Sequence, residues 1–207
     1  MNTAIHVLGH QGRMGSLTCA EIAARTDCVY SGDMESADVV IDFTRADATP
    51  DLLARAVRLH KPYVCCVTGL DPAPLRATSE IVPVLHAVNT SVSLAVFKRA
   101  VADIAASLRP HGYTVAIHDV HHAAKRDAPS GTALALGAAI GGPVSYTSER
   151  MGKVVGEHTV TFTGAHETIA LRHAVTDRRV FARGALEAAI WLAKQPAGFY
   201  GMDDVLF

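Results

Sequence analysis

Short apolar segments alternate with segments of helical spacing over the first 90 residues, and this alternation constrains the fold most. Apolar runs of strand length lie at residues 5–8, 28–31, 38–43, 62–67 and 82–85. Helical segments separate them at residues 13–24, 50–60 and 71–80, and Thr44 is expected to cap the helix after the third strand. Strand–helix–strand units at this spacing predict an α/β fold, a doubly wound parallel sheet covered by helices.

The pattern changes after Asn89. A long amphipathic helix is expected at residues 92–108 and a strand at 113–120, followed by a polar stretch at 121–130 and helices at 132–140 and 180–193. Residues 158–163 and 168–173 alternate polar and apolar side chains, which predicts antiparallel strands. We therefore expect a first domain of residues 1–90, completed by the segment 184–207, and a smaller α+β domain with a mixed sheet at 91–183.

Charge and composition exclude several classes of protein. The 207 residues carry 19 basic and 20 acidic side chains, a net charge of −1, so no nucleic-acid partner is expected. Apolar residues make up 49% and charged residues 19%, which excludes a disordered chain. The best candidate for a membrane span, the 17 uncharged residues at 81–97, contains Pro83 and several polar side chains, so no membrane partner is expected either. Because no basic leader precedes the first strand, a cytoplasmic location is expected.

The four cysteines all lie in the first third of the chain, at Cys19, Cys28, Cys65 and Cys66, and form no C-x-x-C pair. Since neighbouring strand residues face opposite sides, Cys65 and Cys66 are not arranged to act together. We expect small, reduced, apolar core residues rather than disulfides or zinc ligands.

A glycine-rich turn follows the first strand and opens the first helix. Its sequence is Gly9-His10-Gln11-Gly12-Arg13-Met14-Gly15. Glycines allow a tight turn and close approach of the backbone, and the free amides at a helix start face the pyrophosphate of a dinucleotide. In this strand-before, helix-after context the turn predicts a Rossmann-type dinucleotide-binding domain, with a plain structural turn as the alternative.

Asp33 bears on the choice of cofactor, because it lies 18 residues beyond Gly15, at the end of the second strand. A carboxylate at this position accepts hydrogen bonds from the adenosine ribose and repels a 2′-phosphate. The prediction therefore favours NADH, although Arg13 offers a cation for the phosphate of NADPH. The alternative is that Asp33 is a solvated turn residue.

The densest group of chemically active side chains lies between residues 118 and 132, where three histidines, one lysine and one arginine follow a strand. Ser130 is placed to cap the helix that begins at Gly131 and Thr132, and free amides at that helix start form an anion site. Lys125 and the paired histidines lie within reach of an anion held there. This arrangement predicts a small acidic substrate and proton transfer by His or Lys.

The same segment resembles the signature of the dihydrodipicolinate reductase family. The matching motif is His121-His122-x-x-Lys125-x-Asp127-Ala-Pro-Ser-Gly-Thr132. Further similar segments occur in the same order at residues 12–15, 40–44, 156–159, 181–186 and 204–206, so the resemblance spans essentially the whole chain.

The resemblance implies reduction of 4-hydroxy-tetrahydrodipicolinate, or dihydrodipicolinate, to tetrahydrodipicolinate with NADH or NADPH in diaminopimelate and lysine biosynthesis. The substrate is a small dianionic heterocycle. By this similarity His121 is the acid/base residue and Lys125 a proton donor. Substrate-binding residues are expected at His122, Ser130, Gly131, Thr132 and Arg178. The resemblance further implies a homotetramer joined through the sheet of the second domain.

The cofactor contacts implied by the resemblance come from four segments of the first domain. They are Gly9, His10, Gln11, Gly12, Arg13 and Met14, then Asp33, then Cys66, Val67 and Thr68, and finally Ala87, Val88, Asn89 and Thr90. Two of these segments depart from the family pattern. Cys66-Val67 stands where Gly-Thr is usual, and Thr90 where Phe is usual, so cofactor affinity is expected to differ more than substrate chemistry.

Other interpretations of these motifs stay open. His118 and His122 have the spacing of a zinc pair, but no cysteine or acidic cluster completes a site nearby, so no metal is expected. The competing functions are a similar two-domain oxidoreductase for another small imine or carbonyl acid, and a non-catalytic nicotinamide-binding regulator.

Overall fold

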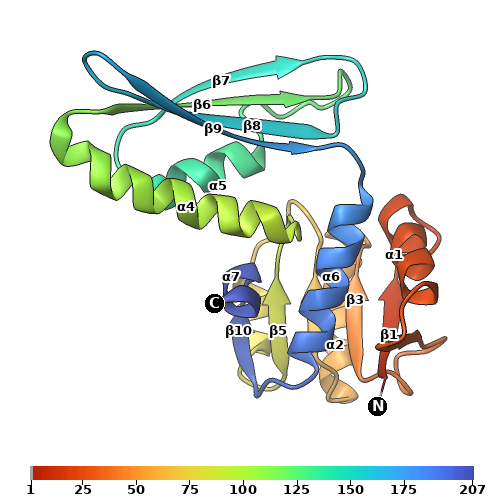
Figure 1. Ribbon diagram of the computed structural model, residues 1–207. Helices are drawn as coiled ribbons and strands as arrows, with labels where there is room; N and C mark the ends of the chain where they lie inside the picture. Colours follow the sequence, from red (N-terminus) through yellow and green to blue (C-terminus); the bar gives the residue numbers. More distant parts are fainter. Residues whose placement is uncertain (1) are drawn as a thin grey trace. The chain divides into compact units, whose positions relative to one another are not determined.

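A computed structural model describes residues 2–207, which divide into two compact units. The first unit comprises the described residues up to Val92 together with Arg179–Phe207, and the second is the continuous segment Ser93–Arg178. Residues 179–183, assigned above to the second domain, thus belong to the first unit. The chain leaves the first unit once and returns to it (Figure 1).

The first unit is built on a six-stranded sheet in the order β10-β5-β4-β3-β1-β2, and every neighbouring pair in it is parallel. Its strands are β1 (Thr3–Leu8), β2 (Cys28–Tyr30), β3 (Val39–Asp42), β4 (Tyr63–Cys65), β5 (Pro83–His86) and β10 (Gly198–Tyr200). Its helices are α1 (Arg13–Ala23), α2 (Thr49–Arg58), α3 (Ala73–Thr78), α6 (Arg179–Leu192) and α7 (Met202–Leu206). This confirms the predicted doubly wound parallel sheet. Strand β10 and helix α7 had not been predicted.

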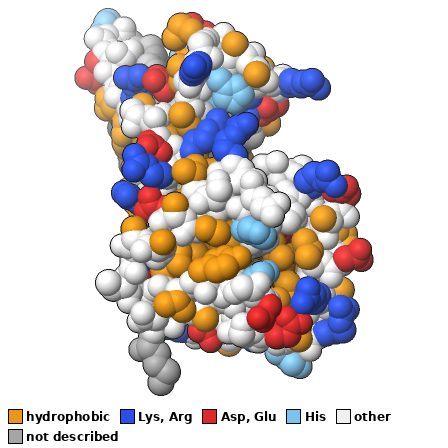
Figure 2. Space-filling model, turned by 90° about the vertical axis from the view of Figure 1, so that its right-hand side faces the viewer, with side chains coloured by type: hydrophobic (Ala, Val, Ile, Leu, Met, Phe, Trp, Pro, Cys, Tyr) orange, Lys and Arg blue, Asp and Glu red, His pale blue; other side chains and the backbone are white. Residues whose placement is uncertain are grey.

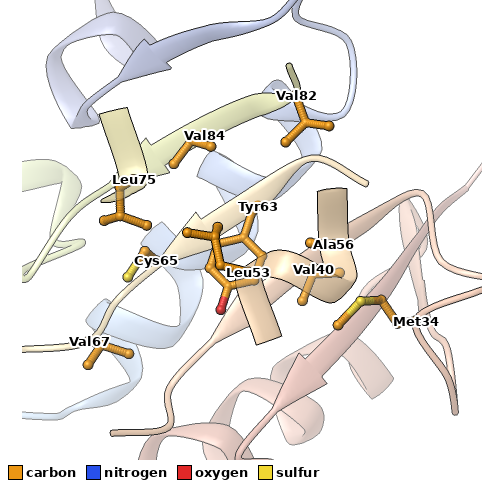
Figure 3. Close-up of a cluster of buried hydrophobic side chains, with 10 residues drawn as sticks. All are labelled: Met34, Val40, Leu53, Ala56, Tyr63, Cys65, Val67, Leu75, Val82 and Val84. Carbon is orange, nitrogen blue, oxygen red and sulfur yellow. The ribbon is translucent and has the colours of Figure 1, made fainter. Parts of the chain in front are cut away.

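The central strands are apolar throughout because helices cover both faces of the sheet, as is usual for parallel strands. On one face Leu53 and Ala56 of α2 and Leu75 of α3 pack on Val40 and Tyr63. Figure 3 shows this cluster of buried side chains converging between the strands and these two helices. On the other face α6 packs on β3, β4 and β5 and contacts α1.

A buried carboxylate, that of Asp42, lies at the carboxyl end of β3. Asp42 is fully buried and accepts hydrogen bonds from the Tyr63 hydroxyl at 2.6 Å and the Thr49 hydroxyl at 3.2 Å. Its other oxygen accepts from the amide and the hydroxyl of Thr44, at 2.8 Å and 2.6 Å. The expectation that Thr44 caps a helix is therefore wrong, because Asp42 draws it into a turn and α2 begins only at Thr49.

Replacing Tyr63 by phenylalanine is expected to lower the free energy of unfolding by about 1–3 kcal/mol, because it leaves one buried oxygen of Asp42 short of a donor. Urea denaturation of the purified protein measures the effect. Tyr30→Phe is the matched control, since Tyr30 is 44% exposed. Equal stability of the Tyr63 variant and the control would contradict the assignment.

The second unit is a mixed four-stranded sheet in the order β7-β6-β8-β9, with two helices. The strands are β6 (Thr114–His121), β7 (Ser145–Arg150), β8 (Gly156–Thr163) and β9 (Thr168–Val175), and the helices are α4 (Val92–Leu108) and α5 (Gly131–Ile140). Strand β7 pairs parallel with β6 and the other pairs are antiparallel, which confirms the mixed sheet. Strand β7 had not been predicted.

The core of the second unit lies between one face of the sheet and both helices. Ile117 of β6 and Phe162 of β8 are almost completely buried there against Val101 of α4 and Leu136 of α5. In Figure 1 both helices run along the same face of this sheet.

The structure also places the cysteines. All four are free thiols, with Cys28 and Cys65 buried and Cys19 and Cys66 partly buried. Burial raises the pKa of Cys65 to about 11, so this thiol is protonated at neutral pH. Separately, none of the helices within residues 2–207 combines the length and apolar character needed to cross a bilayer.

Candidate functional site

The carboxyl ends of β1, β3, β4 and β5 meet at one edge of the first sheet, and the glycine turn lies there. Gly9 has φ +75°, a conformation that favours glycine, and a Cβ added to it would lie 3.1 Å from the carbonyl oxygen of Phe43. A Cβ on Gly15 would lie only 2.1 Å from the carbonyl oxygen of Gly9. The turn therefore packs backbone on backbone at the point where the strand order reverses, between β1 and β3.

This geometry fits a dinucleotide. Helix α1 begins at Arg13, directly after the turn, so its first amides point toward the same edge. Ligands of open α/β sheets bind outside the carboxyl ends of the strands at such a reversal. Of the residues predicted to contact the cofactor here, His10, Gln11, Gly12 and Arg13 are exposed.

Asp33 is exposed in the loop after β2. One of its oxygens accepts hydrogen bonds from the amide and the hydroxyl of Ser36, both at 2.8 Å. These two hydrogen bonds hold the pKa of Asp33 below its ordinary value, so the group is ionised at neutral pH. The carboxylate is thus fixed in position and charged.

The other two predicted cofactor segments follow β4 and β5. The amide of Cys66 donates to the backbone carbonyl of Asp42 at 2.9 Å, and the amide of Ala87 donates to the backbone carbonyl of Cys65 at 3.0 Å. These hydrogen bonds anchor both loops at the same edge of the sheet. Thr68 and Val88 are exposed, whereas Val67 is buried. Thr90 is 3% exposed, and its hydroxyl donates to the carbonyl of Phe181 at 2.7 Å, so its side chain serves the packing of α6.

In the second unit the inner face of the sheet changes from apolar to polar along the strands. Val115 and Ile117 of β6 are followed on the same face by Asp119 and His121. Asp119 lies opposite His158 of β8, which in turn lies opposite His173 of β9. A carboxylate and three imidazoles therefore share one end of this face.

Asp119 is fully buried and has four hydrogen-bond donors. One oxygen lies 2.8 Å from Nδ1 of His121 and accepts from the Arg150 guanidinium, also at 2.8 Å. The other accepts from the Ser148 hydroxyl at 2.6 Å and from the amide of Ser130 at 3.2 Å. The Asp119 carboxylate thus connects β6, both ends of the polar segment at residues 121–130, and the end of β7.

His121 is 8% exposed, at the end of β6. Its ring lies edge-on to the ring of His158, with 5.2 Å between the centroids. Burial lowers the pKa of His121, the hydrogen bond to Asp119 opposes this shift, and the charge of Lys125 adds to it.

His158 received no role from the sequence, yet the structure places it beside His121 and Ser130. Its Nε2 lies 3.2 Å from the Ser130 hydroxyl, and its Nδ1 is buried without a partner among the described residues. Burial lowers the pKa of His158 to about 4, so this ring is neutral at physiological pH.

The loop after β6 carries the remaining predicted residues. Lys125 Nζ lies 2.8 Å from a carboxylate oxygen of Asp127, and the backbone amide of Lys125 donates to the carbonyl of His122 at 3.0 Å. Arg150 also donates to the carbonyl of Asp127, so one guanidinium ties this loop to Asp119. The contacts therefore bring His121, Lys125 and the start of α5 together.

The cap of α5 is confirmed: the Ser130 hydroxyl accepts from the amide of Ala133 at 3.1 Å. Ser130 is 1% exposed, with both its hydroxyl and its amide bonded to protein groups. Its side chain therefore supports the helix start, whereas Gly131 is exposed and Thr132 half-buried. Arg178 lies half-buried directly before α6, and no hydrogen bond or ion pair described among residues 2–207 joins it to His121 or Lys125.

Asp119, Arg150 and His158 also belong to this group, although none of them was predicted to. A signal was present for Asp119, because it lies two residues before His121 and therefore shares its face of the strand. Arg150 had no such signal, since strand β7 itself was not predicted.

Comparison with known proteins decides the family. A model described as dihydrodipicolinate reductase, C-terminus, matches residues 93–206, and one described as dihydrodipicolinate reductase, N-terminus, matches residues 30–90. The chain belongs to the dihydrodipicolinate reductase family. The resemblance drawn from the segment at 121–132 is thereby confirmed.

Relatives within the family share about a third of the sequence. The 4-hydroxy-tetrahydrodipicolinate reductase of Anaplasma marginale is 39% identical over 193 residues, which cover 83% of this chain and 74% of the relative. The enzyme of the same name from Gluconacetobacter diazotrophicus is 36% identical, covering 98% and 96%. A dipicolinate-bound dihydrodipicolinate reductase from Paenisporosarcina sp. TG-14 has the same fold, with a TM-score of 0.80, 18% identity and full coverage of both chains.

Dihydrodipicolinate reductases are nicotinamide-dependent oxidoreductases of the diaminopimelate and lysine pathway, and the predicted enzyme class is confirmed with the family. The non-catalytic regulator, which the sequence left open, is not supported. Hydrogen bonds and an ion pair link His121 to Lys125 through Asp119, Arg150 and Asp127.

Proposed function

We propose that this chain reduces 4-hydroxy-tetrahydrodipicolinate, or the dihydrodipicolinate derived from it, to tetrahydrodipicolinate with NADH or NADPH. The observation that carries the proposal is the group formed by His121, Lys125 and the start of α5, held by Asp119 and Arg150. It combines proton-transfer groups with a binding site for an anion.

The substrate residues divide into those that bind and those that move a proton. The amides of Gly131 and Thr132, in the first turn of α5, would hold one carboxylate of the dianion. Lys125 and His122 supply positive charge or donors beside it, and we assign Arg178 to the other end of the substrate. Figure 2 shows Lys, Arg and His side chains lying near one another on the surface of the molecule.

Proton transfer completes the reduction. A bound reduced nicotinamide would supply a hydride to a conjugated carbon of the substrate ring and so leave an enamine. A nearby acid must then protonate the enamine carbon, and we assign that step to Lys125 and His121. In the first unit, the glycine turn, Asp33 and the loops at 66–68 and 87–90 would hold the cofactor. In the loop at 87–90 the Thr90 side chain contributes through packing.

The direct test couples the purified protein to dihydrodipicolinate synthase and follows the loss of reduced-cofactor absorbance. Oxidation of NADH or NADPH that depends on the synthase product supports the proposal. If neither cofactor is oxidised while a known reductase works in the same mixture, the proposal is wrong. Activity with a different cyclic imine acid alone would favour the second oxidoreductase interpretation.

Replacing Asp33 by alanine is expected to shift the cofactor preference toward NADPH by about tenfold, because the charged carboxylate would otherwise repel a 2′-phosphate. The ratio of kcat/KM for NADPH to that for NADH measures the shift. Asp47→Ala is the matched control, because Asp47 is an exposed carboxylate paired with the exposed Arg45. An unchanged ratio would contradict the ribose-binding role of Asp33.

We also propose a homotetramer in the cytoplasm, joined through the sheet of the second unit. The outer face of this sheet has no helix over it within the described residues, and its edge strand β9 exposes Thr168, Ile169 and Ala170. Light scattering of the purified protein tests the subunit number. A monomeric mass at micromolar concentration would contradict the tetramer.

A further inference from the structure

Asp119 is fully buried within the candidate site, and it takes no direct part in the substrate binding or proton transfer proposed above. Its exposed fraction is zero, while its four donors come from His121, Ser130, Ser148 and Arg150. Burying a carboxylate costs folding free energy unless the group is paired and fully hydrogen-bonded, and Asp119 meets both conditions.

The donors keep Asp119 ionised. Burial alone would raise its pKa, but the hydrogen bonds from Ser148, Ser130, His121 and Arg150 outweigh burial and hold the pKa of Asp119 below its ordinary value. An ionised carboxylate only accepts hydrogen bonds. Because one of its oxygens lies 2.8 Å from Nδ1 of His121, that nitrogen must carry the proton.

The opposite ring nitrogen, Nε2, is then the reactive one. It accepts a hydrogen bond when the ring is neutral and donates one when the ring is charged. A Cβ at position 156 would lie 3.1 Å from this nitrogen, and Gly156 has none. Strand β8 therefore leaves room beside Nε2, where a larger residue would crowd it.

We propose that Asp119 is the positioning residue of this active site, fixing the tautomer and ring orientation of His121 so that Nε2 is presented to the substrate. The inference rests on the proposed acid/base role of His121. It assigns Asp119 no contact with the substrate, and it explains why a carboxylate two residues earlier on the same strand is enclosed by four donors.

The charges around His121 determine how its pKa changes when the carboxylate of Asp119 is removed. Asp119 on β6 favours the charged ring, whereas the charges of Lys125 in the loop and of Arg150 at the end of β7 disfavour it. His158 on β8, the titratable group beside the ring, is neutral at physiological pH. Without the carboxylate, only the unfavourable charges and burial remain. The charged form of His121 should then be lost at a lower pH than in the native protein.

The test is the variant Asp119→Asn in the full chain, studied by kinetics and by long-range ¹H–¹⁵N NMR of labelled histidine. In the native protein the His121 signals should show the Nδ1–H tautomer. In the variant we expect a mixed or reversed tautomer, a His121 titration moved to lower pH, and kcat reduced about 10²- to 10⁴-fold. KM for the substrate should change by less than about threefold, because Asp119 does not touch it.

Asp103→Asn is the matched control. It makes the same change from carboxylate to amide at an exposed residue of α4 in the same unit, so it leaves the His121 tautomer and the turnover unchanged. Asp119→Glu should recover part of the lost kcat, since it restores the negative charge. If Asp119→Asn lowers kcat while the His121 tautomer and titration stay native, the effect is structural and the proposal fails.

Two further outcomes separate this inference from the proposed function. If His121→Gln retains full turnover, the assignment of His121 is wrong. If His121→Gln loses turnover while a folded Asp119→Asn keeps native kcat and pH profile, the positioning role alone is wrong. Should Asp119→Asn not fold, NMR of the native protein still decides, because an Nε2–H tautomer of His121 would overturn the proposal.

Discussion

Replacing Lys125 by alanine is expected to lower kcat/KM about 10²- to 10⁴-fold, the range associated with loss of a proton-transfer group, while leaving NADH affinity unchanged. The side chain is 23% exposed, pairs with Asp127 at 2.8 Å and acts electrostatically on His121. Its loss removes both a cation for the dianion and a proton donor. Steady-state kinetics in the coupled assay and fluorescence titration with NADH measure the two quantities.

The control for this variant is Lys153→Ala, which removes an exposed lysine from the same unit. Its kcat/KM should stay within about twofold of the native value, since surface charges this exposed contribute little. If the Lys125 and Lys153 variants behave alike, Lys125 has no catalytic role. If the Lys125 variant also loses NADH binding, the assignment of the cofactor to the first unit alone must be revised.

The second large effect is expected from Gly15→Ala. The added Cβ would lie 2.1 Å from the carbonyl oxygen of Gly9 and 2.7 Å from Cα of His10, so the backbone of the turn must move. Overpacking of this kind costs about 1–3 kcal/mol. Because the moved atoms belong to the proposed pyrophosphate site, we expect NADH affinity to fall about 5- to 150-fold.

Calorimetric titration with NADH measures this loss, and thermal unfolding shows whether the first unit remains folded. Ser16→Ala is the neighbouring control, because Ser16 is exposed and its hydroxyl donates a hydrogen bond to the carbonyl of Arg13, at 3.2 Å. A folded Gly15→Ala protein with native NADH affinity would show that the turn is structural, the alternative that the sequence left open.

Most of the fold could be predicted because its signals are local. Strands β1, β3, β4 and β5 are apolar runs between helices, and α4 was expected at the bounds observed, Val92–Leu108. Strands β7 and β10 escaped prediction for a physical reason. Strand β7, Ser145–Arg150, is mostly exposed and polar, and β10 has only three residues, so neither carries a clear hydrophobic pattern.

The candidate site was predictable where one stretch of sequence supplied it. His121, Lys125 and the cap at Ser130 lie within ten residues, so a single motif displayed them together. Arg150 and His158 lie beside this segment because β7 and β8 both pair with β6. No local sequence pattern predicts that pairing. The buried state of Ser130 and Thr90 was equally hidden, because burial depends on the tertiary structure.

The interrupted first unit has a consequence for the order in which the newly made protein matures on the ribosome. Helix α6 contributes a row of buried side chains to the first sheet, including Ala182, Leu186 and Leu192, and strand β10 pairs with β5. Until residue 192 has been synthesised, that face of the nascent sheet is uncovered. The continuous segment Ser93–Arg178 can complete its own core earlier. The inserted unit can therefore finish folding before the unit that begins the chain, which is the reverse of the usual N-terminal-first order.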